Sequence, residues 1–194
     1  VRSIAQLSHW NSVDIFDYGH SADGTFYYVM EYLPGLSLQQ LVDQYGPVDA
    51  GRAIYLLRQV CEALREAHQV GLVHRDIKPS NIFAAERGGQ FDVAKLLDFG
   101  LAKPMMEADV ATADAEVSMD GVISGSPLYM SPEQALGDSE PDRRSDIYSL
   151  GGVAYFLVTG RPPYEGDKPL KVILAHANDK LAPPSDHVTA IPLD

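Results

Sequence analysis

The amino-acid sequence predicts an α+β fold in which a few strands come first and helices follow around a loop-rich centre. Two early segments, residues 13–18 and 25–32, are rich in β-branched and aromatic residues and flank a turn of Gly, Ser and Asp. From Asp49 onward, apolar residues recur at helical spacing. With 194 residues, 45% of them hydrophobic, the chain is long enough to form one globular core.

The first helices have recognisable start and stop signals. Ser37 is expected to begin a short helix, and Asp49 to cap a longer one that Gly71 ends. We expect the buried face of the longer helix to carry Ile54, Leu57, Val60, Cys61, Leu64 and His68. Two short apolar segments follow at 82–83 and 93–97, with a Gly-Gly turn between them.

A later segment predicts a helix from Ser145, its expected cap, to Thr159, with Gly160 as its stop. The segment is apolar nearly all round, so the helix belongs inside the core. Gly151 and Gly152 each cost a helix about 1 kcal/mol relative to Ala. We attribute their presence to close packing against other backbone.

Composition excludes several classes of function. The formal net charge of −12 argues against nucleic-acid binding, which needs a basic surface. No stretch reaches the roughly 18 consecutive apolar residues of a membrane-spanning helix. The single cysteine, Cys61, excludes an internal disulfide framework and a cysteine-built zinc site, and we expect it to be buried. The chain opens on Val1 rather than Met, which indicates a piece of a longer protein.

Three short stretches carry the chemistry, and their order along the chain is more informative than any one of them. The first is His74-Arg75-Asp76-Ile77-Lys78-Pro79-Ser80-Asn81, and the second is Asp98-Phe99-Gly100. The third is Gly125 to Glu133, followed by Asp146 to Gly151. With this order and spacing, the chain resembles the bacterial-type serine/threonine protein kinases.

The resemblance covers essentially the whole chain and implies a two-lobe protein-kinase fold. Residues 1–33 would form the end of the N-lobe and the hinge. Residues 34–194 would form most of the helical C-lobe, without its final helices. A cytoplasmic location follows, either for a soluble protein or for the cytosolic part of a membrane-anchored one.

The resemblance also implies ATP-dependent phosphoryl transfer to Ser or Thr hydroxyls of protein substrates. Asp76 would accept the proton of the substrate hydroxyl, and Lys78 would hold the γ-phosphate. Asn81 and Asp98 would supply the oxygen ligands that Mg²⁺ prefers. Read without the family, Asp76 could be a loop-capping carboxylate, Asn81 a turn residue and Asp98 a surface acid.

Further residues would support this site. His74 is expected to be structural, packing under Phe99 and bonding to the loop backbone. By the same resemblance Ile4, Ile15, His74 and Phe99 would stack in a column that ends on Asp146.

The adenine site is expected at the hinge, residues 30–33. The resemblance implies that the backbone of Glu31 and Leu33 meets the adenine edge, with Met30 gating the pocket and Phe83 as its floor. From the residues alone, the same segment is simply the apolar end of a strand.

Two departures from the family matter. No Gly-rich phosphate loop precedes the first strand, and no N-lobe Lys stands in a Val-Ala-x-Lys setting. The sequence 93–95, Val-Ala-Lys, resembles that setting but stands just before Asp98, in the wrong strand. We therefore interpret Lys95 as a decoy, that is, a Lys that only mimics the N-lobe Lys. We therefore expect this stretch alone to bind nucleotide weakly and to be inactive.

Regulation is expected in the acidic loop that precedes Ser126. The family orders this loop with a phosphorylated hydroxyl that pairs with the Arg before the catalytic Asp, here Arg75. Ser118 is the hydroxyl we favour over Ser124 and Thr112, although it could be an ordinary loop serine. Ser126 is expected to stay unmodified, because its hydroxyl would bridge the side chains of Asp76 and Lys78.

Three rival interpretations are weaker. A small-molecule phosphotransferase of the aminoglycoside-kinase type would lack the segment 131–133, Ser-Pro-Glu. A tyrosine kinase would carry Arg and Ala around positions 78–80, where this chain has Lys-Pro-Ser. For the longer protein, a pseudokinase, which binds without catalysing, is disfavoured because this stretch retains every catalytic residue that it could show. For this stretch taken alone, that interpretation stays open.

Overall fold

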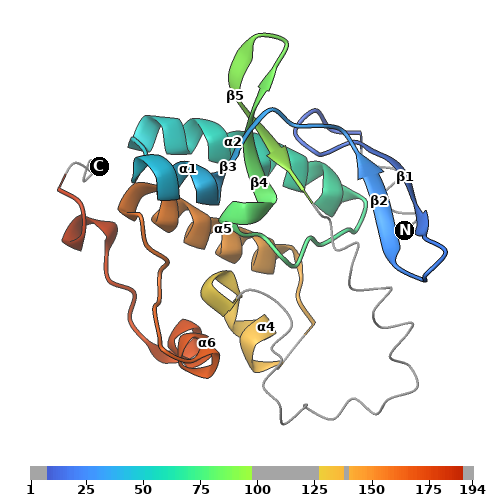
Figure 1. Ribbon diagram of the computed structural model, residues 1–194. Helices are drawn as coiled ribbons and strands as arrows, with labels where there is room; N and C mark the ends of the chain where they lie inside the picture. The colour runs from blue at the N-terminus through green and yellow to red at the C-terminus, as the bar shows by residue number, and fades with distance from the viewer. Residues whose placement is uncertain (1–7, 98–126, 138–139, 190–194) are drawn as a thin grey trace.

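The computed structural model describes residues 8–97, 127–137 and 140–189. Within these ranges three strands come first, and two helices, two further strands and three helices follow, with three short 3-10 turns among them (Figure 1). In chain order they are β1 (Ile15–His20), β2 (Phe26–Met30), β3 (Gly35–Ser37), α1 (Leu38–Tyr45), α2 (Ala50–Gln69), η2 (Pro79–Asn81), β4 (Ile82–Arg87), β5 (Gln90–Leu96), η3 (Pro127–Tyr129), α4 (Pro132–Leu136), α5 (Arg143–Thr159), α6 (Pro169–Asn178) and η4 (Pro184–Asp186).

β1 and β2 form an antiparallel hairpin that is separate from the other sheet. Their pairing runs from Ile15 opposite Met30 to His20 opposite Phe26. The turn between them is closed by Asp23, which accepts hydrogen bonds from the Ser21 hydroxyl and from the Thr25 amide. The two strands expected in this region are confirmed, with bounds shifted by one or two residues.

The second sheet has the order β3-β4-β5, and all its strands are antiparallel. It begins at Gly35, where φ is 140° and an added Cβ would lie 2.3 Å from the Ala84 carbonyl oxygen. Only Gly fits this close approach between β3 and β4. At the far side of the sheet, Ser12 forms a parallel bridge with Leu96 of β5.

The N-caps of the first two helices are as predicted. The Ser37 hydroxyl accepts from the Gln40 amide in a capping box, and the Asp49 side chain accepts from the Gly51 amide. The long helix α2 ends at Gln69.

The predicted face of α2 was partly wrong. Its buried residues are Ala53, Leu56, Val60, Ala63, Leu64 and Ala67. Cys61 and Ile54 are exposed, contrary to our expectation. The reason is that three small Ala side chains form much of the buried stripe, which lets α2 pack closely against β5 and α5.

Helix α5 is the central buried helix, as predicted, but it begins earlier than expected. Its N-cap is Asp142, which accepts from the Arg144 amide at 2.7 Å, whereas Ser145 is buried inside the first turn. Gly160 ends the helix with φ 76°. The close packing against backbone predicted for both glycines of this helix was wrong. Gly152 is closely packed, but against the side chains of Tyr129 and Pro163, and nothing lies within 4 Å of a Cβ at Gly151.

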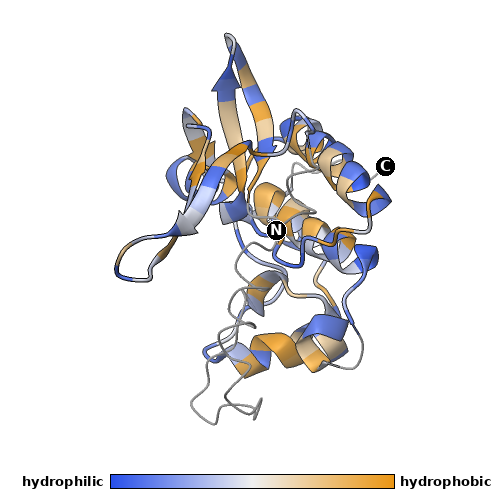
Figure 2. Ribbon diagram, turned by 90° about the vertical axis from the view of Figure 1, so that its right-hand side faces the viewer, coloured by the Kyte–Doolittle hydropathy of each residue, from blue (hydrophilic) through white to orange (hydrophobic). Residues whose placement is uncertain are grey.

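The core lies between α1, α2, α5 and the three-stranded sheet. Its fully buried side chains include Leu38, Leu56, Leu64, Ile77, Ile82, Leu96, Val153 and Leu157. The hydropathy colouring of Figure 2 shows helices that carry both hydrophobic and hydrophilic stretches, as expected when one side of a helix faces a core. None of the helices in the described ranges has the length and apolar character that a membrane span requires.

Candidate active site

The loop that follows α2 is held in place by Asp146, in the first turn of α5. The Asp146 side chain is 1% exposed. Its Oδ1 accepts from the Arg75 amide at 2.8 Å, and its Oδ2 accepts from the His74 amide at 2.9 Å. Oδ2 also lies 2.7 Å from Nε2 of His68. Because hydrogen bonds to a charged acceptor are strong, Asp146 fixes the start of the predicted catalytic loop.

The third predicted motif lies beside this loop. Gln134 of α4 donates from its Nε2 to the Arg75 carbonyl at 3.0 Å. Arg75 itself has φ 68°, a left-handed conformation that is uncommon for a non-Gly residue. The Ser145 hydroxyl donates to Glu133 and so joins α4 to α5. Burial acts to raise the pKa of Glu133, but hydrogen bonds from Ser145 and Ser131 outweigh it and leave this pKa lowered.

His74 is structural, as expected, since its ring bonds to backbone at both nitrogens. The ring is fully buried. Nδ1 accepts from the Asp76 amide at 3.3 Å, and Nε2 lies 2.7 Å from the Leu97 carbonyl oxygen. This pattern fits the tautomer with its proton on Nε2. The imidazole therefore joins the catalytic loop to the residue that precedes Asp98.

Asp76, Lys78 and Asn81 converge at the end of the loop. Nζ of Lys78 donates to Oδ2 of Asp76 at 2.7 Å. Nδ2 of Asn81 donates to the same oxygen at 3.0 Å and to the Asp76 carbonyl at 2.9 Å. The short turn η2 brings Asn81 back toward Asp76, and its first residue is Pro79, which suits the start of a helical turn.

The arrangement leaves specific atoms available for chemistry. The described hydrogen bonds of the Asp76 carboxylate use Oδ2, so Oδ1 is the oxygen that could accept a proton. Those of the Asn81 amide use Nδ2, so Oδ1 is the oxygen that could coordinate a cation. The Lys78 side chain is 25% exposed and could reach an anion in solvent.

The predicted adenine-binding residues belong to β2, to β4 and to the connection between the two sheets. Met30 ends β2, and Glu31 and Leu33 belong to the connection between β2 and β3. This connection lies beside β4, since the Pro34 carbonyl accepts from the Glu86 amide at 2.8 Å. Phe83 is in the same strand, which begins directly after Asn81. The hinge and the catalytic loop are thus both attached to β4.

Several predicted residues fall outside the described part of the chain. These are the metal ligand Asp98, the regulatory residues Ser118 and Ser126, and two members of the expected column, Ile4 and Phe99. The Leu97 amide donates to the Asn81 carbonyl at 2.9 Å. Asp98 is therefore the next residue after one that touches the catalytic loop.

Two residues that our sequence analysis did not assign to the site are part of its framework. Lys95, interpreted above as a decoy, is buried and bonds to Glu31. A Lys within an apolar strand is a signal for a carboxylate partner, because an unpaired buried charge is very costly. His68 was assigned only to a helix face, and its contact with Asp146 depends on tertiary packing that no local pattern shows.

With this geometry described, the chain can be compared with known proteins. Residues 1–187 match the protein kinase domain family, and the chain belongs to that family. The mixed sheet and helices described above are those of a partial protein kinase fold, as the motifs predicted.

Several relatives are serine/threonine protein kinases by name. Pkn3 of Myxococcus xanthus is 38% identical over 95% of this chain and 33% of its own length. PknB of Mycobacterium leprae is 38% identical over the whole of this chain and 30% of its own length. A probable PknB of Corynebacterium glutamicum is 40% identical over 94% of this chain. The chain thus spans about a third or less of the length of these curated relatives.

Proposed function

We propose that the natural protein containing this chain transfers the γ-phosphoryl group of ATP to Ser and Thr hydroxyls of protein substrates. The observation that carries this proposal is the convergence of Asp76, Lys78 and Asn81 on a loop held by Asp146, in a chain of the protein kinase family. Membership of the family supports the use of ATP and protein substrates.

In this proposal, Asp76 acts on the substrate hydroxyl and Lys78 acts on the phosphoryl group that is transferred. The substrate hydroxyl oxygen attacks the γ-phosphorus, the bond from that phosphorus to the β,γ-bridging oxygen breaks, and ADP leaves. Asp76 orients the hydroxyl and takes its proton on Oδ1. Lys78 neutralises charge on the transferred group, which it can reach because its side chain is partly exposed. The protein mainly positions groups and balances charge.

The donor set of the loop fits a hard divalent cation. Asn81 offers an amide oxygen, and Asp98 would offer a carboxylate one residue after Leu97. Bound Mg²⁺ would supply positive charge that offsets the negative charge of the phosphates. We propose these two residues as its ligands.

We propose that the hinge binds the adenine edge, with residues 1–33 as the end of the N-lobe and residues 34–194 as the C-lobe. The Glu31 amide already donates to the Asp14 carbonyl at 2.9 Å, which leaves the Glu31 carbonyl for the adenine amino group. The Leu33 amide would meet the ring nitrogen. Met30 and Phe83 would contact the apolar faces of the base.

The test of this function is an Asp76→Asn variant of the natural protein in a phosphoryl-transfer assay. We expect kcat to fall by about 10²- to 10³-fold with the KM for ATP nearly unchanged, because the lost interaction is made in the transition state. Asp43→Asn, at an exposed position in α1, is the matched control and should keep full activity. A variant that loses ATP binding and keeps kcat would contradict the role of Asp76.

We also propose that a phosphate on Ser118 pairs with Arg75 and so orders the acidic loop. In support, the Arg75 side chain is exposed and forms no ion pair with any residue of the described ranges. Phosphosite mapping by mass spectrometry on the active protein should find Ser118 modified, and Ser118→Ala should lower activity. An unmodified Ser118 with full activity in the Ala variant would refute this.

A further inference from the structure

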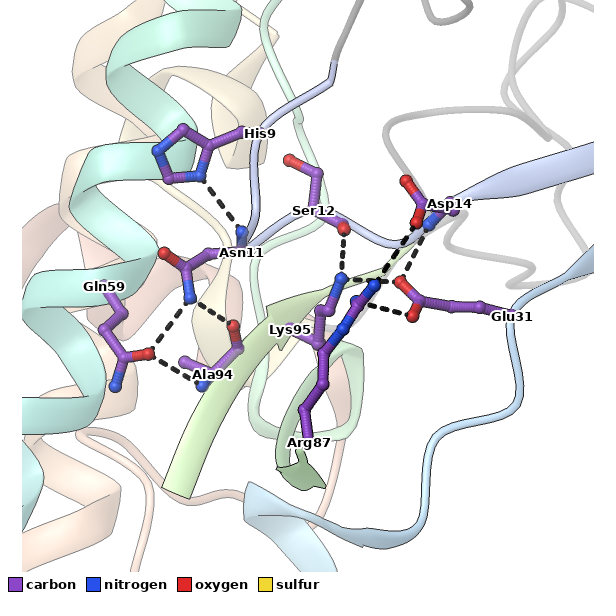
Figure 3. A network of polar contacts seen from close by, with 9 residues as sticks. All are labelled: His9, Asn11, Ser12, Asp14, Glu31, Gln59, Arg87, Ala94 and Lys95. Atoms are coloured by element: carbon purple, nitrogen blue, oxygen red, sulfur yellow. Dashed lines mark hydrogen bonds and ion pairs between the residues drawn. The ribbon is translucent and has the colours of Figure 1, made fainter. Parts of the chain in front are cut away.

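A buried cation lies directly behind the hinge. Lys95 of β5 is 1% exposed, and its Nζ donates to Oε1 of Glu31 at 2.6 Å and to the Ser12 carbonyl at 2.9 Å. Figure 3 shows this ammonium between the two acceptors. Removing a Lys from water is costly unless it is paired and hydrogen-bonded. The free-energy cost of burying the Lys95 ammonium must therefore be offset by its interactions with Glu31 and the Ser12 carbonyl.

Glu31 is held from both sides. Its Oε2 accepts from Nη1 of Arg87 at 2.8 Å, and its Oε1 also accepts from the Asp14 amide at 3.0 Å. Arg87 in turn stacks on the Trp10 ring, 4.3 Å from its centroid. Both carboxylate oxygens of a hinge residue are thus bound by cations that belong to β4 and β5.

These contacts restrict the main chain of the hinge. Glu31 lies in the connection between the two sheets, which has no regular secondary structure of its own. Its amide bonds to Asp14, and its side chain bonds to the neighbouring sheet through Lys95. With both ends of the residue fixed, the peptide that follows it has little freedom to rotate.

We propose that Lys95 is a positioning residue that fixes the Glu31 peptide for adenine and thereby sets the preference for ATP over GTP. This inference rests on the proposed function of the hinge. Adenine presents an amino donor beside a ring acceptor, whereas guanine presents a carbonyl acceptor beside an N–H donor. A backbone carbonyl and amide reject guanine only if they cannot turn, because hydrogen bonds weaken steeply when misaligned.

Lys95 should matter more than Arg87 for this purpose. The Arg87 side chain is 33% exposed, so water can replace part of its interaction with Glu31. The Lys95 side chain is buried, so water cannot replace its interaction. Lys95 also bonds to Ser12, so it holds both the hinge and the segment that precedes β1.

The experiment measures kcat/KM for ATP and for GTP in the natural protein with Lys95→Met, which keeps the length of the side chain and removes its charge. We expect the KM for ATP to rise about tenfold, kcat to stay within about twofold, and the ATP-to-GTP ratio of kcat/KM to fall about tenfold. The control is Arg52→Met, which removes another cation bonded to the β4–β5 hairpin, through Asp92, away from the hinge. That variant should keep the ratio of the unmodified protein.

A ratio that stays unchanged in Lys95→Met would overturn the proposal, whatever happens to thermal stability. If Lys95→Met does not fold, Glu31→Gln decides the question, since it removes the charge that pairs with Lys95 and leaves one acceptor oxygen for three donors. A lowered ratio in that variant supports the proposal, and an unchanged one overturns it. Failure of the proposed function is a separate result, because it appears as absence of phosphoryl transfer in the unmodified protein.

Discussion

Two carboxylates fix two segments of this chain, the proposed catalytic loop and the proposed hinge, and they do so with different partners. Asp146 accepts from two backbone amides and contacts His68, whereas Glu31 lies between the cations of Lys95 and Arg87. Asp146 belongs to the central helix of the core, while Glu31 lies in an irregular connection. The catalytic loop is therefore fixed through its main chain, and the hinge is fixed mainly through side-chain charge.

Because their partners differ, the two carboxylates should affect stability differently: Asp146 that of the whole fold, and Glu31 that of one segment. A carboxylate that satisfies buried backbone amides cannot be replaced without leaving those amides unpaired. A carboxylate between two cations loses only part of its interactions when one group changes. Removing Asp146 should affect the whole helical core, and altering Glu31 should affect the hinge.

The largest effect is expected for Asp146→Asn. The Asn carbonyl oxygen can replace one acceptor, but its amide group faces backbone N–H groups that it cannot satisfy. We expect the free energy of unfolding to fall by about 3–4 kcal/mol. Urea denaturation measures this, with Asp142→Asn as the control, because Asn is an equally good helix cap at that position. An equal fall in the free energy of unfolding of the two variants would show that Asp146 contributes no more to stability than the helix cap Asp142.

Glu31→Gln should have a smaller and more local effect, about 2 kcal/mol, because Gln keeps one acceptor oxygen for the surrounding donors and the partly exposed Arg87 can turn to solvent. Amide hydrogen exchange distinguishes the two carboxylates. Protection should fall around Asp14 and Glu31 in this variant, and throughout α5 in Asp146→Asn. Loss of protection across α5 in Glu31→Gln would remove the distinction between the two regions.

The same contrast explains what sequence alone could predict. Asp76, Lys78 and Asn81 could be grouped in advance because they are close in sequence, and their side chains do meet in the structure. Helix ends were predictable where a single residue caps them, as at Ser37 and Asp49. These features are local, so a short window of residues contains all the information they need.

Predictions failed where distant segments decide the outcome. The exposure of Cys61 follows from which side of α2 meets β5 and α5, and three Ala residues determine that side. The sequence did not show the role of Lys95 in holding Glu31, because the two residues are 64 positions apart. The true cap of α5, Asp142, precedes the predicted one because Ser145 is used instead to bind Glu133.

The packing that supports Asp146 can be tested at the two adjacent glycines of α5. A Cβ at position 152 would lie 3.2 Å from the Tyr129 ring, whereas nothing lies within 4 Å of one at position 151. We expect Gly152→Ala to destabilise the fold by about 1–2 kcal/mol through overpacking. Gly151→Ala should stabilise it by about 0.5–1 kcal/mol, because Ala is the better helix former. Thermal denaturation of the pair would contradict this if both changes had the same sign.

The smallest expected effect is a pH dependence of stability that comes from His176 of α6, which contacts Tyr148 of α5. Nδ1 of His176 lies 2.8 Å from the hydroxyl of Tyr148, its ring packs edge-on against Tyr164, and its Nε2 is buried without a hydrogen-bond partner among the described residues. Burial lowers the pKa of His176 below its ordinary value of 6.5. The unfolded chain therefore binds a proton more readily than the folded one. The stabilising contribution is complete above pH 6.5 and is lost as the pH falls toward the folded-state pKa.

We expect this loss to be about 1 kcal/mol at most between pH 7 and pH 5.5. Only the part of this range below pH 6.5 contributes fully, and there one group changes stability by at most about 1.4 kcal/mol per pH unit. His176→Gln should flatten the dependence, and the exposed His187→Gln should leave it unchanged. Urea denaturation at a series of pH values measures the slope. An equal slope in His176→Gln and the unmodified chain would show that the titrating group lies elsewhere.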